Sequence, residues 1–243
     1  MSRALPGAIL LAAGAMLACG PRPAPMTEES ERRAREEMVR TQIAKRGIRD
    51  QRVLQAMREV PRHLFVDPAF RREAYADHPL PIGDGQTVSQ PYIVALMAEL
   101  LDIQPQDRIL EIGTGSGYSA AVLSRIAREV DSIEILPDLS ARAQERLKSL
   151  GCTNVFFRVG DGYRGWPEKA PFDGILVTAA PRIAPQPLLE ELAPNGRMVI
   201  PVGDFYQELK VFAKDEKGNV TEHSVLPVRF VPMTGEAEAP PPH

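Results

Sequence analysis

The chain has 243 residues, of which 44% are hydrophobic and 25% are charged, and its formal net charge is −3. This composition fits one globular domain with tails, and the small negative charge argues against a broad nucleic-acid-binding surface. The two cysteines, Cys19 and Cys152, provide neither a disulfide framework nor a metal site with ligand spacing, and the four histidines are scattered.

The first 25 residues have the composition of an export signal. Arg3 supplies a positive start and residues 4–18 are almost wholly apolar, although the run is short for a membrane span. The segment Met16–Cys19 resembles the cleavage box of bacterial lipoproteins, in which the cysteine receives a lipid. Residues 20–25 then predict a Pro-rich tether. The alternative is that Met26 is the true first residue, and the two interpretations imply different compartments.

Two helices are expected next. From Thr27 to about Lys45, oppositely charged residues at helical spacing predict a solvated helix. A second helix is expected from about Asp50 to Val60 and ends at Pro61. Its apolar residues share one face: Val53, Leu54, Met57 and Val60.

Residues 62–91 lack clear periodicity and contain many prolines and glycines. A loop of this length inside a compact domain is usually functional. Within it, the segment Gln86-Thr87-Val88-Ser89-Gln90-Pro91 stands out. Ser89 is also well placed to cap the following helix, whose apolar face includes Ile93, Met97 and Leu101, and capping is the structural alternative to a functional role.

A glycine-rich turn follows. The stretch 108–118 opens with an apolar run, places glycines at every second position and ends where a helical pattern begins, which predicts a buried strand turning tightly into a helix. Glycine lets a ligand approach the backbone, and the helix start offers free N–H groups. We expect a nucleoside-bearing ligand there, held by Gly113, Thr114, Gly115, Ser116 and Gly117.

The spacing of these glycines separates two cofactor classes. The dinucleotide pattern G-x-G-x-x-G requires glycine at position 118, where the chain has Tyr118. Glu111 lies two residues before the first glycine, and a carboxylate aimed into the turn would repel a pyrophosphate and attract a cationic ligand such as S-adenosylmethionine. A ligand-free strand-turn-helix remains a minor alternative.

Two further acidic residues follow predicted strands. Glu134 lies near the end of the strand Val130–Ile135, about 20 positions past the glycine turn, where an acid is placed to accept both ribose hydroxyls. Asp161 follows the strand Val155–Val159 and precedes Gly162, and is placed to accept from an adenine amino group. The alternatives are a solvated glutamate and an ordinary turn aspartate.

The remaining elements complete an alternating pattern. Helices are expected at 118–127, 139–150 and 187–192, and strands at 172–177 and 198–202, with a turn at Asn195-Gly196. Runs at 209–213 and 220–226 suit antiparallel edge strands. The chain therefore predicts an α/β fold with a doubly wound, mostly parallel sheet, N-terminal helices and antiparallel edge strands. We expect one domain over residues 26–235 and a disordered tail over 236–243.

Several stretches together resemble the protein-L-isoaspartate (D-aspartate) O-methyltransferase family. The resemblance covers about residues 35–235 and rests on Val60–Phe65, Pro79–Gly83, Gln86–Pro91, Leu110–Tyr118, Gly160–Gly162 and Val228–Pro232. The segment holding Ser89 is specific to that family, whereas the glycine turn is shared by many methyltransferases. The N-terminal export signal departs from the family, whose members are usually cytosolic.

The resemblance implies a class I, Rossmann-like fold and methyl transfer from S-adenosylmethionine to the free carboxylate of isoaspartyl residues in damaged peptides. Ser89 matches the family's active-site serine, and Glu111, Glu134 and Asp161 match its cofactor-contacting acids. Because a carboxylate is already anionic at neutral pH, no strong general base is needed, and a hydroxyl that positions the carboxylate suffices. Thr87, Val88, Ser89 and Arg229 are the expected substrate-binding residues, with a structural salt bridge as the alternative for Arg229.

Two competing functions remain at this point: a small-molecule methyltransferase of the same fold, and a non-enzymatic envelope lipoprotein. The expected partners are isoaspartyl peptides and proteins, without nucleic acid, and a monomer is the default. Family and donor supply favour the cytoplasm, while a lipid anchor through Cys19 is the alternative location.

Overall fold

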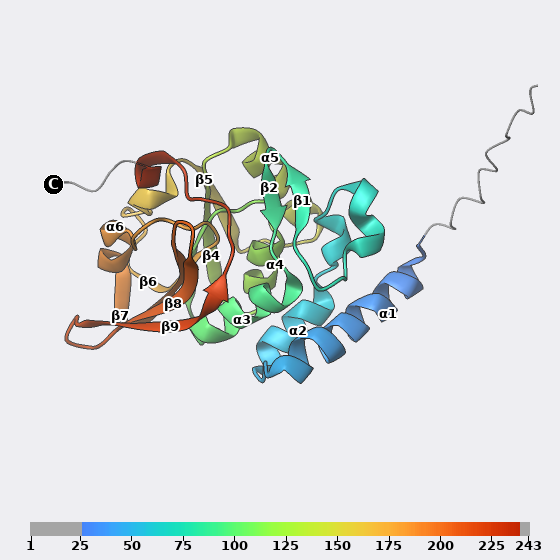
Figure 1. The fold of residues 1–243 in the computed structure, drawn as a ribbon, viewed down its shortest axis with the longest axis horizontal. Helices are drawn as coiled ribbons and strands as arrows, with labels where there is room; N and C mark the ends of the chain where they lie inside the picture. The colour runs from blue at the N-terminus through green and yellow to red at the C-terminus, as the bar shows by residue number, and fades with distance from the viewer. Residues whose placement is uncertain (1–25, 239–243) are drawn as a thin grey trace, which may run out of the picture.

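The computed structural model describes residues 26–238 (Figure 1). The predicted signal and tether of residues 1–25 lie outside the described residues, as does the end of the predicted tail, and those predictions stay predictions. Among residues 26–238, no helix combines the length and the apolar character needed to cross a bilayer.

The core of the fold is a seven-stranded sheet with strand order β5-β4-β3-β6-β7-β8-β9. Strands β5, β4, β3, β6 and β7 run parallel, and β8 and β9 are antiparallel additions at one edge. The predicted fold class is confirmed. The strands of this sheet are β3 (Arg108–Ile112), β4 (Glu129–Glu134), β5 (Val155–Val159), β6 (Phe172–Val177), β7 (Leu192–Gly203), β8 (Gln207–Lys214) and β9 (Val220–Val228).

Helices cover both faces of the sheet, because the side chains of each parallel strand alternate between two apolar layers. In β3, Ile109 packs with the N-terminal helices, whereas Leu110 and Ile112 pack against the face covered by the short helix α6 and the segment after β5. The helices are α1 (Glu28–Met38), α2 (Gln51–Glu59), α3 (Pro91–Leu101), α4 (Tyr118–Ser124), α5 (Pro137–Ser149) and α6 (Gln186–Glu190).

The expected elements differ from the structure in several places. The helix expected from Thr27 to about Lys45 is α-helical only to Met38 and continues as a π-helix (Val39–Ile43) and a 3-10 turn (Ala44–Arg46). The predicted loop 62–91 contains a two-stranded hairpin, β1 (Leu80–Gly83) and β2 (Gln86–Val88). The turn predicted at Asn195-Gly196 is a bulge inside β7, where Asn195 has φ 63° and four residues separate the partners of Phe172 and Gly174. Helix α4 ends at Ser124, earlier than expected. Residues 235–238, assigned to the disordered tail apart from Gly235, form a short 3-10 helix.

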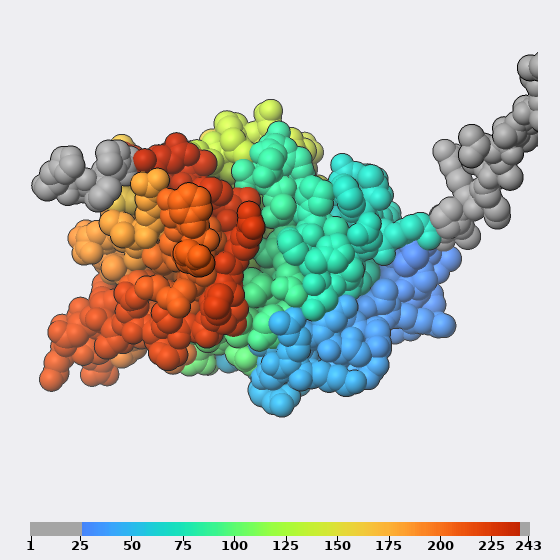
Figure 2. All heavy atoms as spheres, viewed as in Figure 1, coloured from blue at the N-terminus to red at the C-terminus, as the bar shows by residue number. Residues whose placement is uncertain are grey.

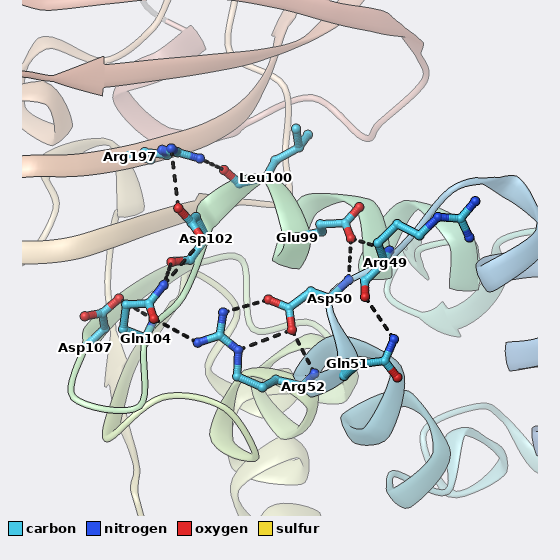
Figure 3. Close-up of polar contacts among 10 residues, drawn as sticks. All are labelled: Arg49, Asp50, Gln51, Arg52, Glu99, Leu100, Asp102, Gln104, Asp107 and Arg197. Atoms are coloured by element: carbon cyan, nitrogen blue, oxygen red, sulfur yellow. Dashed lines mark hydrogen bonds and ion pairs between the residues drawn. The ribbon is translucent and has the colours of Figure 1, made fainter.

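Polar contacts fasten the N-terminal helices to α3 (Figure 3). One carboxylate oxygen of Glu99 accepts the backbone N–H groups of Arg49 (2.5 Å) and Asp50 (2.7 Å), just before α2. Asp50 caps α2 by accepting the N–H of Arg52, whose guanidinium also reaches Gln104. Because α3 begins at position 91, these contacts fix the helix that carries the Gln86–Pro91 segment at its start.

We expect Glu99→Ala to lower the free energy of unfolding by about 1–3 kcal/mol, because it leaves two backbone N–H groups without their charged acceptor. Urea unfolding followed by circular dichroism measures the change. The matched control is Glu145→Ala in α5, an exposed glutamate that should leave stability within about 0.5 kcal/mol of the unmodified chain. Equal midpoints for the two variants would contradict the anchoring role of Glu99.

Candidate active site

The turn between β3 and α4 is built from glycines with positive φ. Gly113, Gly115 and Gly117 have φ of 92°, 55° and 86°, which L side chains rarely adopt. A Cβ on Gly113 would overlap the hydroxyl of Thr178, and one on Gly117 would overlap the side chain of Leu147. The sequence therefore needs glycine here both for conformation and for space.

A cavity lies against this turn at the carboxyl ends of the parallel strands. It encloses about 850 Å³, part of it open to solvent. The cavity is lined by the segment after β1, the glycine turn, the end of β4, the residues after β6 and the C-terminal segment: Gln86, Thr87, Val88, Ser89, Val94, Ile112, Gly113, Thr114, Gly115, Ser116, Tyr118, Ser119, Ile133, Glu134, Ile135, Leu139, Gly162, Thr178, Ala179, Val231, Pro232, Met233 and Thr234.

Glu134 is the carboxylate in the cavity wall. Its two oxygens accept the backbone N–H of Gly115 (2.8 Å) and of Leu136 (3.1 Å), so the side chain is locked between the glycine turn and the start of α5. The next residue, Ile135, is partly exposed and offers an apolar surface beside the acid. This pairing of a fixed acceptor with an apolar surface fits a ribose and its base.

Glu111 lies elsewhere than the motif suggests. Its side chain is 0% exposed and does not line the cavity. It accepts a hydrogen bond from Ser132 (2.5 Å), whose hydroxyl is 2.6 Å from that of Thr114 in the glycine turn. Glu111 therefore supports the turn from the buried side, whereas Glu134 is the carboxylate that lines the cavity.

Burial raises the pKa of Glu111 to about 8, and the nearby Glu134 carboxylate acts in the same direction, while hydrogen bonds from Ser132 and Ser119 oppose the shift. One of its oxygens has no hydrogen-bond partner among the described residues. At neutral pH the protonated form therefore predominates, and this side chain supplies no full negative charge to attract a cation.

The raised pKa of Glu111 predicts a pH-dependent stability. Above its ordinary pKa of 4.5 the carboxyl ionises in the unfolded chain but stays protonated in the folded one until about pH 8. The folded state then holds the extra proton, so stability falls as pH rises through this window, by up to about 1.4 kcal/mol per unit. We expect Glu111→Gln to flatten that slope in the donor-free protein, measured by urea unfolding between these limits. An unchanged slope, equal to that of the exposed control Glu145→Gln, would contradict the shifted pKa.

Asp161 is not among the residues that line the cavity. It caps the short turn after β5 by accepting the N–H of Tyr163 (2.9 Å), and its other oxygen accepts the N–H of Glu236 (2.8 Å) from the C-terminal 3-10 helix. Its neighbour Gly162 does line the cavity, and a Cβ at that position would overlap Ile112. The structure thus brings Gly162, but not the Asp161 carboxylate, to the glycine turn.

A second, more open hollow of about 1,410 Å³ adjoins the cavity. Thr87, Ser89, Thr178 and Val231 line both spaces, so they form the wall between them. The other lining residues are Arg46, Pro79, Gln90, Tyr92, Ile93, Leu226, Pro227, Val228, Arg229 and Phe230. We call this hollow the outer groove.

Ser89 stands in the dividing wall with an uncommitted hydroxyl. The capping alternative is wrong, because the N-cap of α3 is Gln90 and no side chain caps that helix. Within residues 26–238, no hydrogen bond to the Ser89 side chain is formed. Its hydroxyl is therefore free to bind something that reaches the wall from the outer groove.

Arg229 borders the outer groove and is exposed, and it forms no ion pair with another described residue, so the structural salt bridge is not formed there. A second arginine, Arg46, lines the same groove, where it stacks over Tyr92 and pairs with Asp77. Nothing in the local sequence around Arg46 predicts a place in the site, because only the tertiary fold brings this residue to the groove.

The β1–β2 hairpin covers the glycine turn. The Ile82 side chain lies over Gly115, and Asp84 at the hairpin tip forms an ion pair with Arg142 of α5 (2.6 Å). The hairpin therefore lies beside the cavity and contacts both the glycine turn and α5.

Comparison with solved structures supports the same class. A structure of a protein-L-isoaspartate O-methyltransferase superposes with a TM-score of 0.76 at 32% identity, covering 84% of this chain and 67% of that one. A structure of a putative protein-L-isoaspartate O-methyltransferase from Plasmodium falciparum, in complex with S-adenosyl-L-homocysteine, superposes with a TM-score of 0.71 at 25% identity. The match covers 82% of this chain and 98% of that one. Fold, glycine turn and strand-end cavity define a class I S-adenosylmethionine-dependent methyltransferase.

Similar sequences identify the family within this class of methyltransferases. The family model for protein-L-isoaspartate(D-aspartate) O-methyltransferase matches residues 32–238. The protein-L-isoaspartate O-methyltransferase 1 of Syntrophobacter fumaroxidans is 54% identical over 204 residues, 84% of this chain and 95% of the relative. The protein-L-isoaspartate O-methyltransferase of Methanoregula boonei is 53% identical over 214 residues, which cover 88% of this chain and 96% of the relative. The chain belongs to the protein-L-isoaspartate(D-aspartate) O-methyltransferase family.

Proposed function

We propose that the chain transfers a methyl group from S-adenosylmethionine to the free α-carboxylate of L-isoaspartyl residues in damaged polypeptides. The observation that carries the proposal is the position of Ser89, whose free hydroxyl stands in the wall between the cavity at the glycine turn and the outer groove. A reaction between a small, enclosed donor and a side chain of a large polypeptide needs this arrangement.

The enclosed cavity suits the donor. The backbone from Gly113 to Gly117 lies open to a ligand, Glu134 faces the place where a ribose would bind, and Ile135 supplies an apolar surface for the adenine. When bound there, S-adenosylmethionine supplies a sulfonium-borne methyl group. Asp161 does not line the cavity, and its role at the adenine amino group stays a proposal that rests on the family resemblance. Each of its carboxylate oxygens keeps a second lone pair beyond its bond to Tyr163 or Glu236.

The wall between the two spaces suits the acceptor. The Ser89 hydroxyl donates a hydrogen bond to the isoaspartyl carboxylate and holds one oxygen toward the donor cavity, while Thr87 and Val88 flank it. Alignment of two reactants in this way supplies roughly 7–11 kcal/mol of a barrier. None of the three histidines in the described part of the chain lines either space, which agrees with an acceptor that needs no general base.

The outer groove suits a polypeptide. Its walls combine apolar side chains with two arginines, Arg46 and Arg229, and no acidic residue. Arg46 is already paired with Asp77, so Arg229, which forms no ion pair with another described residue, is the cation that attracts the substrate's carboxylate. After the methyl ester is released from the protein, the adjacent amide nitrogen attacks the ester carbonyl, methanol leaves and a succinimide forms. Water then opens the succinimide to an aspartyl or an isoaspartyl linkage.

A peptide pair tests the function. An isoaspartyl peptide and its normal aspartyl twin are incubated with the protein and methyl-labelled donor, and only the isoaspartyl peptide is expected to gain label. Equal labelling of both peptides, or labelling of neither, would remove the proposal. A small-molecule methyltransferase would label neither peptide but would still bind donor, and a non-enzymatic lipoprotein would show no donor binding by calorimetry.

We propose a cytoplasmic location, supported by the family and by the site of donor synthesis, with lipid anchoring through Cys19 as the alternative. Membrane fractionation of cells carrying the full chain or its Cys19→Ala variant separates the two. Recovery of both proteins in the cytosolic fraction supports the proposal, whereas release from membranes by Cys19→Ala alone contradicts it.

A further inference from the structure

The connection between β7 and β8 carries two aromatic side chains that contact almost nothing. Phe205 and Tyr206 are each 94% exposed, more than any other large apolar residue in the described part of the chain. Ile183, which is 60% exposed, belongs to the neighbouring segment, where Arg182 pairs with Asp204. We call Phe205 and Tyr206 the aromatic tip.

The backbone holds the aromatic tip in place. Strands β7 and β8 stay paired as far as Gly203 and Gln207, so the tip is a tight hairpin. Gly203 has φ 131°, and a Cβ there would overlap the carbonyl oxygen of Tyr206. Its N–H donates to Pro181 (2.9 Å). The turn thus fixes the backbone that presents the rings to solvent, and an aromatic side chain has only two side-chain torsions to order on binding.

The aromatic tip is continuous with the outer groove. Gln207, the next residue, holds Phe230 on both sides: its amide nitrogen donates to the Phe230 carbonyl (3.2 Å) and its amide oxygen accepts the Phe230 N–H (2.6 Å). Gln207 also pairs with Val228, and both Val228 and Phe230 line the groove. In Figure 2 the orange end of β7 stands beside the red C-terminal segment, which faces the teal and green segments across a hollow.

We propose that the aromatic tip binds apolar side chains of the substrate polypeptide on one flank of the isoaspartyl residue, outside the groove. The occupant is an extended, unfolded segment of the same chain that enters the groove, so the inference rests on the proposed function. Such a contact favours isoaspartyl sites in unfolded, apolar stretches over short or polar ones.

Charge near the aromatic tip argues against a membrane as the occupant. Anionic membranes are recognised by clusters of lysine and arginine. The tip instead has Asp204 on one side and Glu208 on the other, and the adjacent Arg182 is paired with Asp204. A polypeptide already held in the adjoining groove reaches the tip without needing such a cluster.

The test compares three isoaspartyl substrates with one central sequence. The first is a peptide of about six residues, which extends over about 20 Å. The second and third are about three times longer, one with Leu and Phe on each flank and one with Gly and Ser. For the double variant Phe205→Ser, Tyr206→Ser we expect KM for the apolar long peptide to rise about tenfold with kcat unchanged. The other two substrates should stay within about twofold.

Phe156→Ser on β5 is the matched control, since this aromatic residue is 44% exposed on the opposite edge strand. It should leave all three substrates unchanged. Unaltered KM for the apolar long peptide in the double variant would overturn the inference. If the double variant had half the mass of the unmodified protein in solution and lost kcat/KM equally on all three substrates, the tip would bind a second copy of the chain, and the inference would be overturned. Failure of the unmodified protein to label the short peptide would instead remove the proposed function.

Discussion

Replacing Ser89 by alanine is expected to lower kcat/KM for an isoaspartyl peptide about 100-fold, the usual effect of removing one hydrogen-bond donor aimed at a reacting oxygen. Ser89 has no hydrogen-bond partner within residues 26–238, so its loss breaks no internal contact. Folding and donor binding should therefore be unchanged. Initial rates of peptide methylation measure kcat/KM, and calorimetric titration of S-adenosylhomocysteine into the same preparation measures the affinity of the donor site.

Two further variants sharpen this test. Ser89→Thr keeps the hydroxyl and should recover part of the lost rate. Ser149→Ala, an exposed serine at the end of α5 whose hydroxyl bonds only within its own helix, should behave like the unmodified protein. A Ser89→Ala protein with full activity, or one that loses donor binding in proportion to activity, would contradict a positioning role at the acceptor.

The complementary prediction concerns Glu134. Glu134→Ala is expected to weaken donor binding about 100-fold, because two hydrogen bonds from ribose hydroxyls to a charged acceptor are lost. The variant also frees the N–H groups of Gly115 and Leu136, so the melting temperature of the donor-free protein should fall. Calorimetric titration of S-adenosylhomocysteine measures the affinity.

Glu134→Gln separates the two roles of this side chain. Its single amide oxygen still accepts the N–H of Gly115, but its NH2 group leaves the N–H of Leu136 without an acceptor. Stability should therefore fall less than in Glu134→Ala, while affinity for the donor should fall to an intermediate value. An affinity for the donor that is unaffected in both variants would contradict the assignment of Glu134 to the ribose.

The sequence predicted the framework of the site because its signals are local. Alternating apolar strands, the glycines at 113, 115 and 117 and an acid at the end of the next strand each lie within about 30 residues of the turn, as in any parallel βαβ unit. Parallel strands place their carboxyl ends together, so Glu134 and Gly162 meet the glycine turn once the fold class is correct.

Side-chain direction was harder to predict. Glu111 precedes the turn as a ligand-binding acid would, yet strand alternation points it under α4, and only the packing of α4 against the sheet decides its burial. Ser89 has the residue type of a cap, but the helix begins at Pro91, so Gln90 is the N-cap residue. Spacing in the sequence does not distinguish these outcomes.

Residues that reach the site from distant parts of the chain are not marked by any pattern in the sequence around them. Arg46, Thr178 and the segment 231–234 reach the two hollows from three distant parts of the chain. The sequence Asn195-Gly196 predicted a turn, but it forms a β-bulge. Residues that tolerate the left-handed αL conformation occur in both turns and bulges, so the sequence does not distinguish them. Residues 235–238 (Gly-Glu-Ala-Glu) show no apolar periodicity, yet the N–H of Glu236 donates a hydrogen bond to Asp161.

A crystal structure of the protein with S-adenosylhomocysteine and an isoaspartyl peptide tests the central claim most directly. The account predicts the nucleoside at Glu134, the peptide in the outer groove and its free carboxylate within hydrogen-bonding distance of the Ser89 hydroxyl, facing the donor sulfur. A peptide bound elsewhere, or a carboxylate turned away from Ser89 with the donor site filled, would contradict it.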